Sequence, residues 1–319
     1  MKKIALLIAG GTISMEDTGG GGADIAKSNP FEQFGDVSQE KIFNPLLPSP
    51  HITQHEMLEI RKAVIRKIEQ GFEGVIVTHG TDILEETAYF LDLTIEANVP
   101  VVLIGAMRSM DNKGYDGVYN LEAAIKVASS PEAVGMGVLV VMNDEIHAAR
   151  NVTKTHASNV ATFQSPQAGP MGVVTAGGVR MNQRPFSNHR RYPLETITKN
   201  VILLKAFAGM DSQIFDALDS AGVAVDGFVV EGFGSGNLPP GTLSGLRKFL
   251  DKGIPVVLVS RCLSGNPGPV YKYMGGGAHL EELGVIFSFG LNGPKARLKL
   301  IAALEAALSR DEMVAEFRM

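Results

Sequence analysis

The chain has 319 residues, of which 45% are hydrophobic and 20% charged, and its formal net charge is -5. This length is enough for one large or two moderate domains, each with its own hydrophobic core. Because no block of basic residues is visible and no apolar stretch is long enough to span a membrane, we expect neither a nucleic acid nor a membrane as a partner.

In the first half of the chain, short β-rich runs alternate with amphipathic helical patterns. The apolar run from Ile4 to Ala9 is shorter than the hydrophobic region of a secretory signal, so it predicts a strand. Such alternation is typical of a parallel sheet covered by helices on both faces. The predicted strands are 3–9, 74–78, 100–104 and 136–142, and the predicted helices are 53–71, 83–96 and 117–128.

The pattern changes near residue 182. Residues 183–199 are polar and contain two prolines, which predicts a linker. We therefore expect an α/β protein in which a larger N-terminal domain, 1–182, has a mainly parallel sheet flanked by helices, and a smaller C-terminal α/β domain covers 200–319. In the second domain the predicted strands are 200–205, 226–231, 254–259 and 284–288, and the predicted helices are 211–221, 241–252 and 293–308.

A long polar stretch, residues 15–45, follows the first predicted strand and contains the glycine run Gly19–Gly22. Loops of this length in compact domains are usually functional or disordered. Its position just after Thr12 favours a mobile lid, and a flexible connection without function is the alternative.

The cysteine and histidine content gives no metal site. Cys262 is the only cysteine, which fits a reducing compartment and a cytoplasmic protein, and we expect it to be buried. His51 and His55 are four residues apart, but without a third ligand they predict a surface helix. There is no G-x-S-x-G and no G-x-G-x-x-G motif, which argues against a serine hydrolase of the α/β type and a dinucleotide enzyme.

Two segments place a threonine where a predicted strand ends. IALLIAGGTIS contains Thr12, and GVIVTHGTDILEET contains Thr81 and Asp82. In open parallel sheets, ligands bind beyond the carboxyl ends of the strands. The neighbouring Gly11 and Gly80 allow the backbone to approach a ligand, and helix N-termini favour an anionic or oxyanionic group there.

A threonine hydroxyl is a poor nucleophile at pH 7 and needs a base or a desolvated amine nearby. Lys154, in ARNVTKTHASNVATF, is a candidate, because a lysine buried beside a hydroxyl can fall in pKa and accept a proton. Each residue also has a simpler interpretation. Lys154 alone is typical of a solvated surface, and a threonine at a strand end is often a cap or a turn residue.

Together, these segments resemble the bacterial-type L-asparaginases over almost the whole chain and in the same order. The resemblance implies an amidohydrolase that converts L-asparagine to L-aspartate and ammonia through a threonine nucleophile, without a metal or an organic cofactor. It also implies a homo-oligomer, either a dimer or a tetramer built as a dimer of dimers. The segments are IAGGTIS, GVIVTHGTDILEETAYFLDLT, VVLIGAMRSMDNKGYDGVYNL, GVLVVMNDEIHAARNVTKTHASNVATF, GFGSGNLPPG and LNGPKAR.

The resemblance also implies roles for individual residues. Asn237 matches a residue that in the family reaches a neighbouring subunit's site, and the carbonyl of Ala106 matches a contact to the substrate amide. Which threonine attacks first is left open. The implied catalytic residues are Thr12, Thr81, Asp82 and Lys154, and the implied substrate-binding residues are Gly11, Ser49, Gly80, Ala106 and Asn237.

Two departures from the family concern the substrate and the first base. The family has a tyrosine in the lid, whereas residues 13–45 contain none, and Pro50 stands where one branch has a glutamine that binds the substrate amine.

Two alternative functions are a non-catalytic amino-acid-binding homologue and a glutaminase-type subunit of a tRNA-dependent amidotransferase. The negative net charge and a first strand at residue 3 disfavour the latter.

For the role of the missing tyrosine we expect water or a relaying hydroxyl. Ser14 and Thr18 are the candidate hydroxyls in the lid. Tyr271 and Tyr273 rank lower, because nothing in the sequence places them at the required distance.

Overall fold

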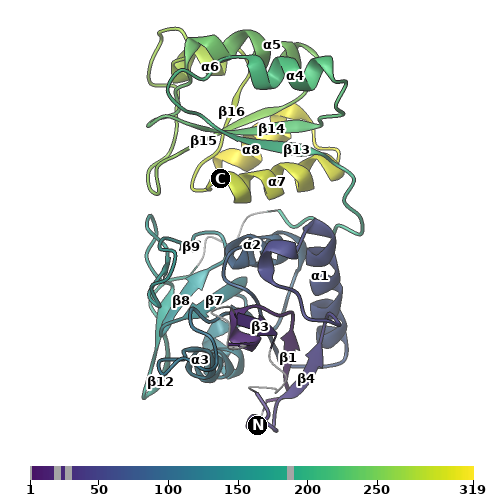
Figure 1. Ribbon diagram of the computed structural model, residues 1–319, viewed down its shortest axis with the longest axis vertical. Coiled ribbons are helices and arrows are strands. Elements are labelled where there is room, and N and C mark those ends of the chain that lie inside the picture. The colour runs from purple at the N-terminus through teal and green to yellow at the C-terminus, as the bar shows by residue number, and fades with distance from the viewer. Residues whose placement is uncertain (1, 18–22, 26–30, 185–189) are drawn as a thin grey trace. The chain divides into compact units, whose positions relative to one another are not determined.

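The computed structural model describes residues 2–17, 23–25, 31–184 and 190–319 (Figure 1). The chain divides into two compact units, Met1–Glu195 and Thr196–Met319. The predicted linker, 183–199, spans this division, and its residues 185–189 lie outside the described residues. Two residues of that segment, Tyr192 and Leu194, are buried.

Within the described residues, the first unit is built on one eight-stranded sheet. From one edge to the other, its strands are β12 (Gly178–Met181), β11 (Gly172–Thr175), β8 (Glu145–Ala148), β7 (Val138–Met142), β6 (Val101–Ile104), β5 (Gly74–Thr78), β1 (Ile4–Ile8) and β4 (Ser38–Lys41). Strands β7, β6, β5, β1 and β4 are parallel, whereas β8, β11 and β12 continue the sheet antiparallel. Every residue of β1, β5, β6 and β7 is buried, as expected for strands covered on both faces.

In the part of the first unit that the structure describes, three helices cover this sheet (Figure 1). Helix α3 (Gly117–Ser129) packs Leu121 and Val127 into a core cluster with alternate β1 residues Ile4, Leu6 and Ile8. Because strand side chains alternate between faces, the intervening β1 residues point to the other side. Helices α1 (Gln54–Glu69) and α2 (Leu84–Thr94) contact each other and the strands of this sheet.

Two small antiparallel pairs lie outside the large sheet. One pairs β2 (Met15–Asp17) with β3 (Ala23–Ile25), within the stretch expected to form a lid. The other pairs β9 (Thr153–Lys154) with β10 (Phe163–Gln164). Three short turns of 3-10 helix belong to the same unit: η1 (Thr12–Ser14), η2 (Ser49–His51) and η3 (Pro131–Ala133).

The second unit is a smaller parallel sheet with helices. Its core brings together the rings of Phe215, Phe228 and Phe249, with centroid distances of 5.3 Å and 4.8 Å from Phe228 to Phe215 and to Phe249. Asn292 caps the helix that begins at Gly293 by accepting the N–H of Lys295. The strands are, in sheet order, β13 (Val201–Lys205), β14 (Gly227–Gly232), β15 (Val256–Ser260) and β16 (Ile286–Phe287), and the helices are α4 (Gln213–Ser220), α5 (Leu243–Asp251), α6 (Gly277–Glu282), α7 (Gly293–Glu305) and α8 (Arg310–Arg318), with the turn η4 (Pro240–Thr242).

The predicted fold class, a larger and a smaller α/β unit with mainly parallel strands, is confirmed. Ten helices and strands among the described residues were not predicted, namely β2, β3, β4, β8, β9, β10, β11, β12, α6 and α8. The expectation that Cys262 is buried is wrong, because its side chain is exposed.

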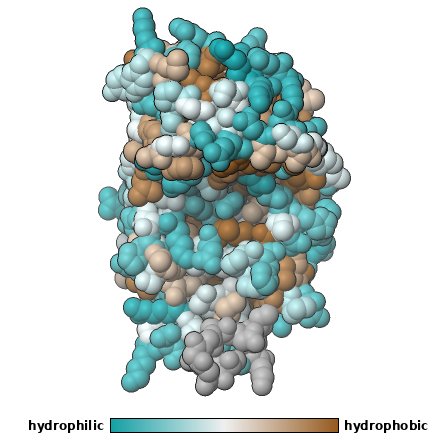
Figure 2. All heavy atoms as spheres, turned by 45° about the horizontal axis from the view of Figure 1, so that its top comes forward, coloured by the Kyte–Doolittle hydropathy of each residue, from teal (hydrophilic) through white to brown (hydrophobic). Residues whose placement is uncertain are grey.

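Hydrophilic residues dominate the face shown in Figure 2, with smaller apolar areas between them. Among the described residues, no helix is long and apolar enough to cross a membrane.

Candidate active site

Thr12 lies in the turn that follows β1. The two residues before it, Gly10 and Gly11, have φ angles of 128° and 90°, which glycine adopts without steric cost. A Cβ on Gly11 would lie 2.2 Å from the Cα of Gly80. The loop after β1 and the loop after β5 therefore touch at two glycines, each next to one of the candidate threonines.

Thr81 follows β5, the strand beside β1, and is only 6% exposed. Ile8 and Thr78 are partners in the parallel register, so the two threonines follow the carboxyl ends of neighbouring strands. Among the described residues no side chain caps the N-terminus of α2, so the interpretation of Thr81 as a helix cap is wrong. A Cβ on Gly105 would lie 2.8 Å from the Thr81 methyl group, which locates Thr81 against the end of β6.

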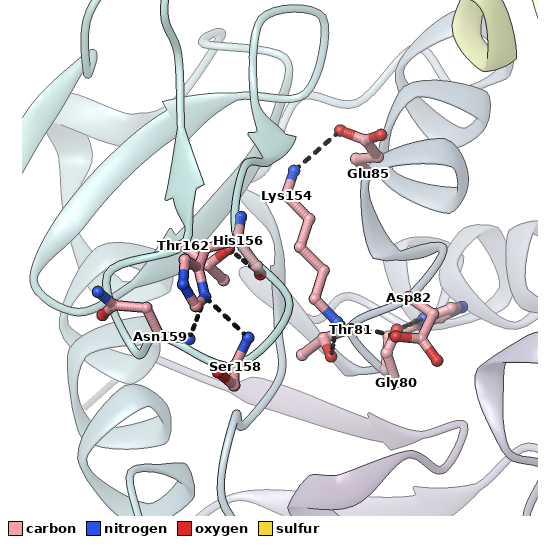
Figure 3. Close-up of polar contacts among 10 residues, drawn as sticks. Gly80, Thr81, Asp82, Glu85, Lys154, His156, Ser158, Asn159 and Thr162 are labelled. Carbon is pink, nitrogen blue, oxygen red and sulfur yellow. Dashed lines mark hydrogen bonds and ion pairs between the residues drawn. The ribbon is translucent and has the colours of Figure 1, made fainter.

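Lys154 extends from β9 towards Thr81, 73 residues away in the chain (Figure 3). Its Nζ donates to Thr81 Oγ1 at 3.0 Å and to Asp82 Oδ1 at 2.8 Å. The Lys154 side chain is 17% exposed and that of Asp82 58%. A pair with one exposed partner adds little to stability, so its main effect is to hold the amine beside the Thr81 hydroxyl.

The loop that returns from β9 to β10 is closed by its own side chains (Figure 3). His156 Nδ1 accepts the N–H groups of Ser158 and Asn159 at 3.0 Å and 3.1 Å. Thr162 Oγ1 accepts the N–H of His156 at 2.7 Å. The backbone N–H of Lys154 itself donates to Glu85 Oε2 on α2. These contacts hold the backbone of Lys154 and of the loop after it in place, and none of them was identified from the sequence.

His79 was also missed. It is fully buried, with Nδ1 2.8 Å from the carbonyl of Gly80 and Nε2 2.9 Å from the hydroxyl of Thr87. A carbonyl can only accept, so Nδ1 carries the hydrogen and Nε2 accepts from Thr87. Burial lowers the pKa of His79 to about 4, which keeps the ring neutral near pH 7. The neutral ring fixes the peptide that precedes Thr81. Its signal in the sequence is a histidine directly after the strand GVIVT, which is apolar except for its last residue.

Ala106 lies in the loop after β6 and is fully buried. The Asp116 carboxylate accepts the N–H of Met107 at 3.0 Å, and Asn120 Nδ2 donates to the carbonyl of Gly105 at 3.0 Å. Asp116 and Asn120 therefore hold the backbone on both sides of Ala106. Neither residue was identified from the sequence, although their spacing of four places them on one face of a helix start.

The two other predicted substrate-binding side chains, Ser49 and Asn237, belong to different units. Ser49 is buried, and a Cβ on Gly80 would lie 2.5 Å from its Oγ. Asn237 belongs to the second unit, where its Oδ1 accepts the N–H of Gly277 at 3.2 Å. The first unit brings together, beyond the ends of β1, β5 and β6, the residues Gly11, Thr12, Ser49, Gly80, Thr81, Asp82, Ala106 and Lys154.

The candidates for the missing tyrosine are distributed differently. Ser14 is buried, and its hydroxyl has no hydrogen-bond partner among the described residues. Thr18 and the glycine run 19–22, on which the lid expectation depended, lie outside the described residues. Tyr271 and Tyr273 are exposed on the second unit, with their rings stacked 5.3 Å apart. His51 and His55 are both exposed, and the described residues contain no group of three or more His, Cys, Asp or Glu that could hold a metal.

The first unit is thus an α/β fold in which a lysine reaches a threonine beyond the carboxyl end of a parallel strand. Comparison with known proteins identifies the protein family. The family model described as "Asparaginase, N-terminal" matches residues 3–187, and the "Glutaminase/Asparaginase C-terminal domain" matches residues 200–317. The chain therefore belongs to the asparaginase family.

Individual relatives agree with this assignment. A probable L-asparaginase from Deinococcus radiodurans is 39% identical over 321 residues, covering 98% of this chain and 96% of that protein. An L-asparaginase from Bacillus licheniformis is 34% identical over 312 residues, covering 95% of each. The crystal structure of a probable cytoplasmic L-asparaginase from Campylobacter jejuni superposes with a TM-score of 0.86 at 32% identity, covering 99% of both chains.

Proposed function

We propose that this protein is an L-asparaginase, which hydrolyses the side-chain amide of L-asparagine to give L-aspartate and ammonia. The observation that carries the proposal is the 3.0 Å hydrogen bond between Lys154 Nζ and Thr81 Oγ1, beside the turn that carries Thr12. An amine held against a hydroxyl at a site with a second threonine is the arrangement that nucleophilic amide cleavage needs. Membership of the asparaginase family supports the choice of substrate.

In this proposal the hydroxyl of Thr12 attacks the amide carbon. Within the described residues that hydroxyl has no hydrogen-bond partner, so it is free to approach a substrate. The proton of the Thr12 hydroxyl passes through water to the amide nitrogen, the carbon–nitrogen bond breaks, and ammonia leaves. A second water then hydrolyses the aspartyl ester, which gives aspartate and regenerates the Thr12 hydroxyl. Backbone N–H groups near Gly11 and Gly80 stabilise the oxyanion, and removing one such donor typically costs about 3 kcal/mol.

The second group moves protons and binds the amino acid. The Lys154 amine, which is hydrogen-bonded to Thr81 Oγ1, assists proton transfer at that hydroxyl. The exposed carboxylate of Asp82 binds the α-ammonium group, and Ser49 binds the α-carboxylate. The carbonyl of Ala106 accepts from the substrate amide. The chemistry is carried by these side chains and needs no metal or organic cofactor.

Ammonia release from asparagine tests the proposal directly. We expect turnover in the native protein and a loss of several orders of magnitude in both Thr12→Val and Thr81→Val, with melting temperatures close to the native value. Peptide mass spectrometry of quenched Thr81→Val should find the aspartyl adduct on Thr12, and an adduct on Thr81 in Thr12→Val would reverse the assignment. Binding of aspartate without any ammonia release would identify an amino-acid-binding homologue.

Glutamine provides a second substrate test. It is one methylene longer than asparagine, and a methylene in a pocket is worth roughly 1–3 kcal/mol. Pro50 has no side-chain hydrogen bond to offer the substrate amine. We therefore expect asparagine to be preferred at least about tenfold in kcat/KM, and equal values for the two amides would contradict this part of the proposal.

We also propose that the protein is a cytoplasmic homo-oligomer, a dimer or a tetramer. Large apolar side chains are exposed on the second unit, from 40% for Ile214 to 66% for Leu263, and exposed apolar surface often marks an interface. Asn237, on the same unit, would then contribute to a neighbouring subunit's site. The exposed thiol of Cys262 is compatible with a reducing compartment. Sedimentation of the native protein and of Leu263→Glu tests the assembly, and a native monomer would refute it.

Finally, we propose that residues 183–199 link an N-terminal domain, 1–182, to a C-terminal domain, 200–319. The gap between the two matched family regions, which end at 187 and begin at 200, supports this division. Proteolysis confined to 183–199 would support it further, and cleavage elsewhere before that segment would count against it.

A further inference from the structure

The turn that carries Thr12 is tied to a distant loop at two points. The hydroxyl of Tyr115 donates to the carbonyl of Ile13 at 2.6 Å, across 102 residues of sequence. Five residues earlier in the same loop, the N–H of Met110 donates to the carbonyl of Met15 at 3.0 Å. The first bond reaches the carbonyl of the residue that follows the candidate nucleophile, and the second reaches a carbonyl three residues after it.

This turn has little internal support. It is a single 3-10 turn of three residues, Thr12–Ser14, with two backbone bonds: Ser14 N–H donates to the Gly11 carbonyl at 2.9 Å, and Met15 N–H donates to the Thr12 carbonyl. The two residues before it are glycines at positive φ, whose backbone is the least restricted of any residue type. The orientation of the Thr12 peptide therefore depends on contacts from outside the turn as well as on these two bonds.

Tyr115 is itself well placed to supply such a contact. Its N–H donates to the carbonyl of Asn112 at 2.9 Å, and a Cβ on Gly117 would lie 2.3 Å from its hydroxyl oxygen, so only glycine leaves room for the phenol. The next residue, Asp116, is anchored on the N–H groups of Met107 and Arg108. The loop that holds Ala106 thus also carries the phenol that reaches the Thr12 turn.

We propose that Tyr115 is a positioning residue for Thr12: its hydroxyl holds the carbonyl of Ile13 and thereby fixes the Thr12 hydroxyl in the direction of attack. The proposal rests on the function proposed above, in which Thr12 is the nucleophile. Tyr115 remains protonated throughout the reaction. Burial and the charge of Asp116 raise its pKa, so it acts as a hydrogen-bond donor and not as the proton acceptor.

Tyr115→Phe removes the hydroxyl and keeps the ring. Displacing a nucleophile by a fraction of an ångström reduces the rate of attack but leaves the contacts to the rest of the substrate in place. We expect kcat to fall about tenfold or more while KM for asparagine changes less than about twofold. The pH profile of kcat/KM should keep its shape, because the lost group does not titrate in the catalytic range.

Tyr119→Phe is the matched control. This exposed phenol, four residues further on, donates to Asp144 Oδ2 at 2.8 Å. The Tyr119→Phe variant should lose one tyrosine hydrogen bond, as Tyr115→Phe does, and keep the native kcat. Both variants are assayed well below their measured melting temperatures, so that a difference in stability does not enter the comparison.

Three outcomes would overturn the proposal. These are a kcat of Tyr115→Phe within twofold of the native value, a loss caused by a raised KM, and a pH profile that loses one limb, since the last would make Tyr115 the proton acceptor. Thr12→Val separates this proposal from the proposed function. If Thr12→Val keeps full turnover, the function assigned to Thr12 fails. If Thr12→Val is inactive and Tyr115→Phe is normal, only the inference about Tyr115 fails.

Discussion

The two threonines at the centre of the site follow neighbouring parallel strands, yet they are held in different ways. The Thr81 hydroxyl is bonded to Lys154, and the peptide before it is bonded to a buried histidine. The Thr12 hydroxyl has no partner among the described residues, and its turn is positioned through main-chain atoms, by the close approach of Gly11 to Gly80 and by the hydrogen bond from Tyr115.

This difference corresponds to two chemical tasks. A group that transfers protons must be connected to its acid or base before the substrate arrives. A nucleophile must instead leave its oxygen free and place it accurately, which is done most directly by fixing its backbone. We therefore expect truncation of a side chain to lower kcat strongly at Lys154, the partner of Thr81. At the Thr12 turn, we expect substitutions that displace the backbone to lower kcat.

The largest expected effect is that of Lys154→Met. Without the amine, Thr81 loses its proton-transfer partner, and kcat should fall by about 10²–10⁴ with little change in melting temperature. Lys62→Met is the control, because Lys62 forms an exposed ion pair with Glu59 at 2.8 Å. Near-native turnover in a folded Lys154→Met protein would show that Thr81 does not depend on this amine.

Gly11→Ala should break the contact between the two loops. The new Cβ would lie 2.2 Å from the Cα of Gly80 at a φ of 90°, so the turn must move. We expect kcat to fall about 100-fold and stability to fall by about 1–3 kcal/mol. Gly35→Ala introduces the same methyl where no atom lies within 4 Å and should be close to native in both. Full activity in Gly11→Ala would mean that the Thr12 turn tolerates displacement.

His79 makes stability depend on pH. Its folded pKa of about 4 lies below its ordinary value of 6.5, so between these values the unfolded chain binds the extra proton. The free energy of unfolding should therefore fall by about 3 kcal/mol as pH falls from above 6.5 to 4, and the full contribution is present above 6.5.

Denaturant unfolding at pH 7 and pH 4.5 measures this effect. His79→Gln should be less stable at pH 7 and should show a smaller difference between the two pH values. His55→Gln, which alters an exposed histidine, should keep the native difference. An equal pH dependence in the native protein and in His79→Gln would show that another group is responsible.

The smallest expected effect is that of Ser14→Ala. Removing a buried hydroxyl that has no partner among the described residues should change the free energy of unfolding by less than about 0.5 kcal/mol. Turnover should also be unchanged, because water can take the place of the missing lid tyrosine. Ser288→Ala, a second buried hydroxyl of the same kind, is the control. A loss of kcat in Ser14→Ala alone would identify Ser14 as a proton relay.

The central elements were predictable from the sequence because their physical requirements are local. Strands β1, β5, β6 and β7 are apolar at nearly every position, as a strand covered on both faces must be. Strand β4 was missed because SQEK is polar. It is an edge strand, and its Glu40 forms an ion pair with Lys67 instead of packing in the core.

The site was predictable in part. The motifs identified Thr12, Thr81 and Lys154 as candidates, and the fold was required to show that the lysine lies within hydrogen-bond distance of the second threonine. Tyr115 was missed because the backbone carbonyl that it binds, 102 residues away in the sequence, is brought near only by the fold. His79 was missed because its ring binds the carbonyl of the next residue and the hydroxyl of Thr87, and neither contact can be read from the pattern of residue types. Sequence reasoning identifies reactive side chains more readily than the residues that orient main-chain atoms.

The β9–β10 pair has a consequence for how the enzyme loses activity on heating. The amine of Lys154 is presented by a hairpin of two residue pairs, anchored by the buried Phe163 and separate from the eight-stranded sheet. Small units of this kind open at a lower free-energy cost than the core to which they are attached. The hairpin should therefore open while the sheet is intact, so that heat inactivation is reversible below the global melting temperature. Amide hydrogen exchange should be faster at Thr155 than anywhere in β5.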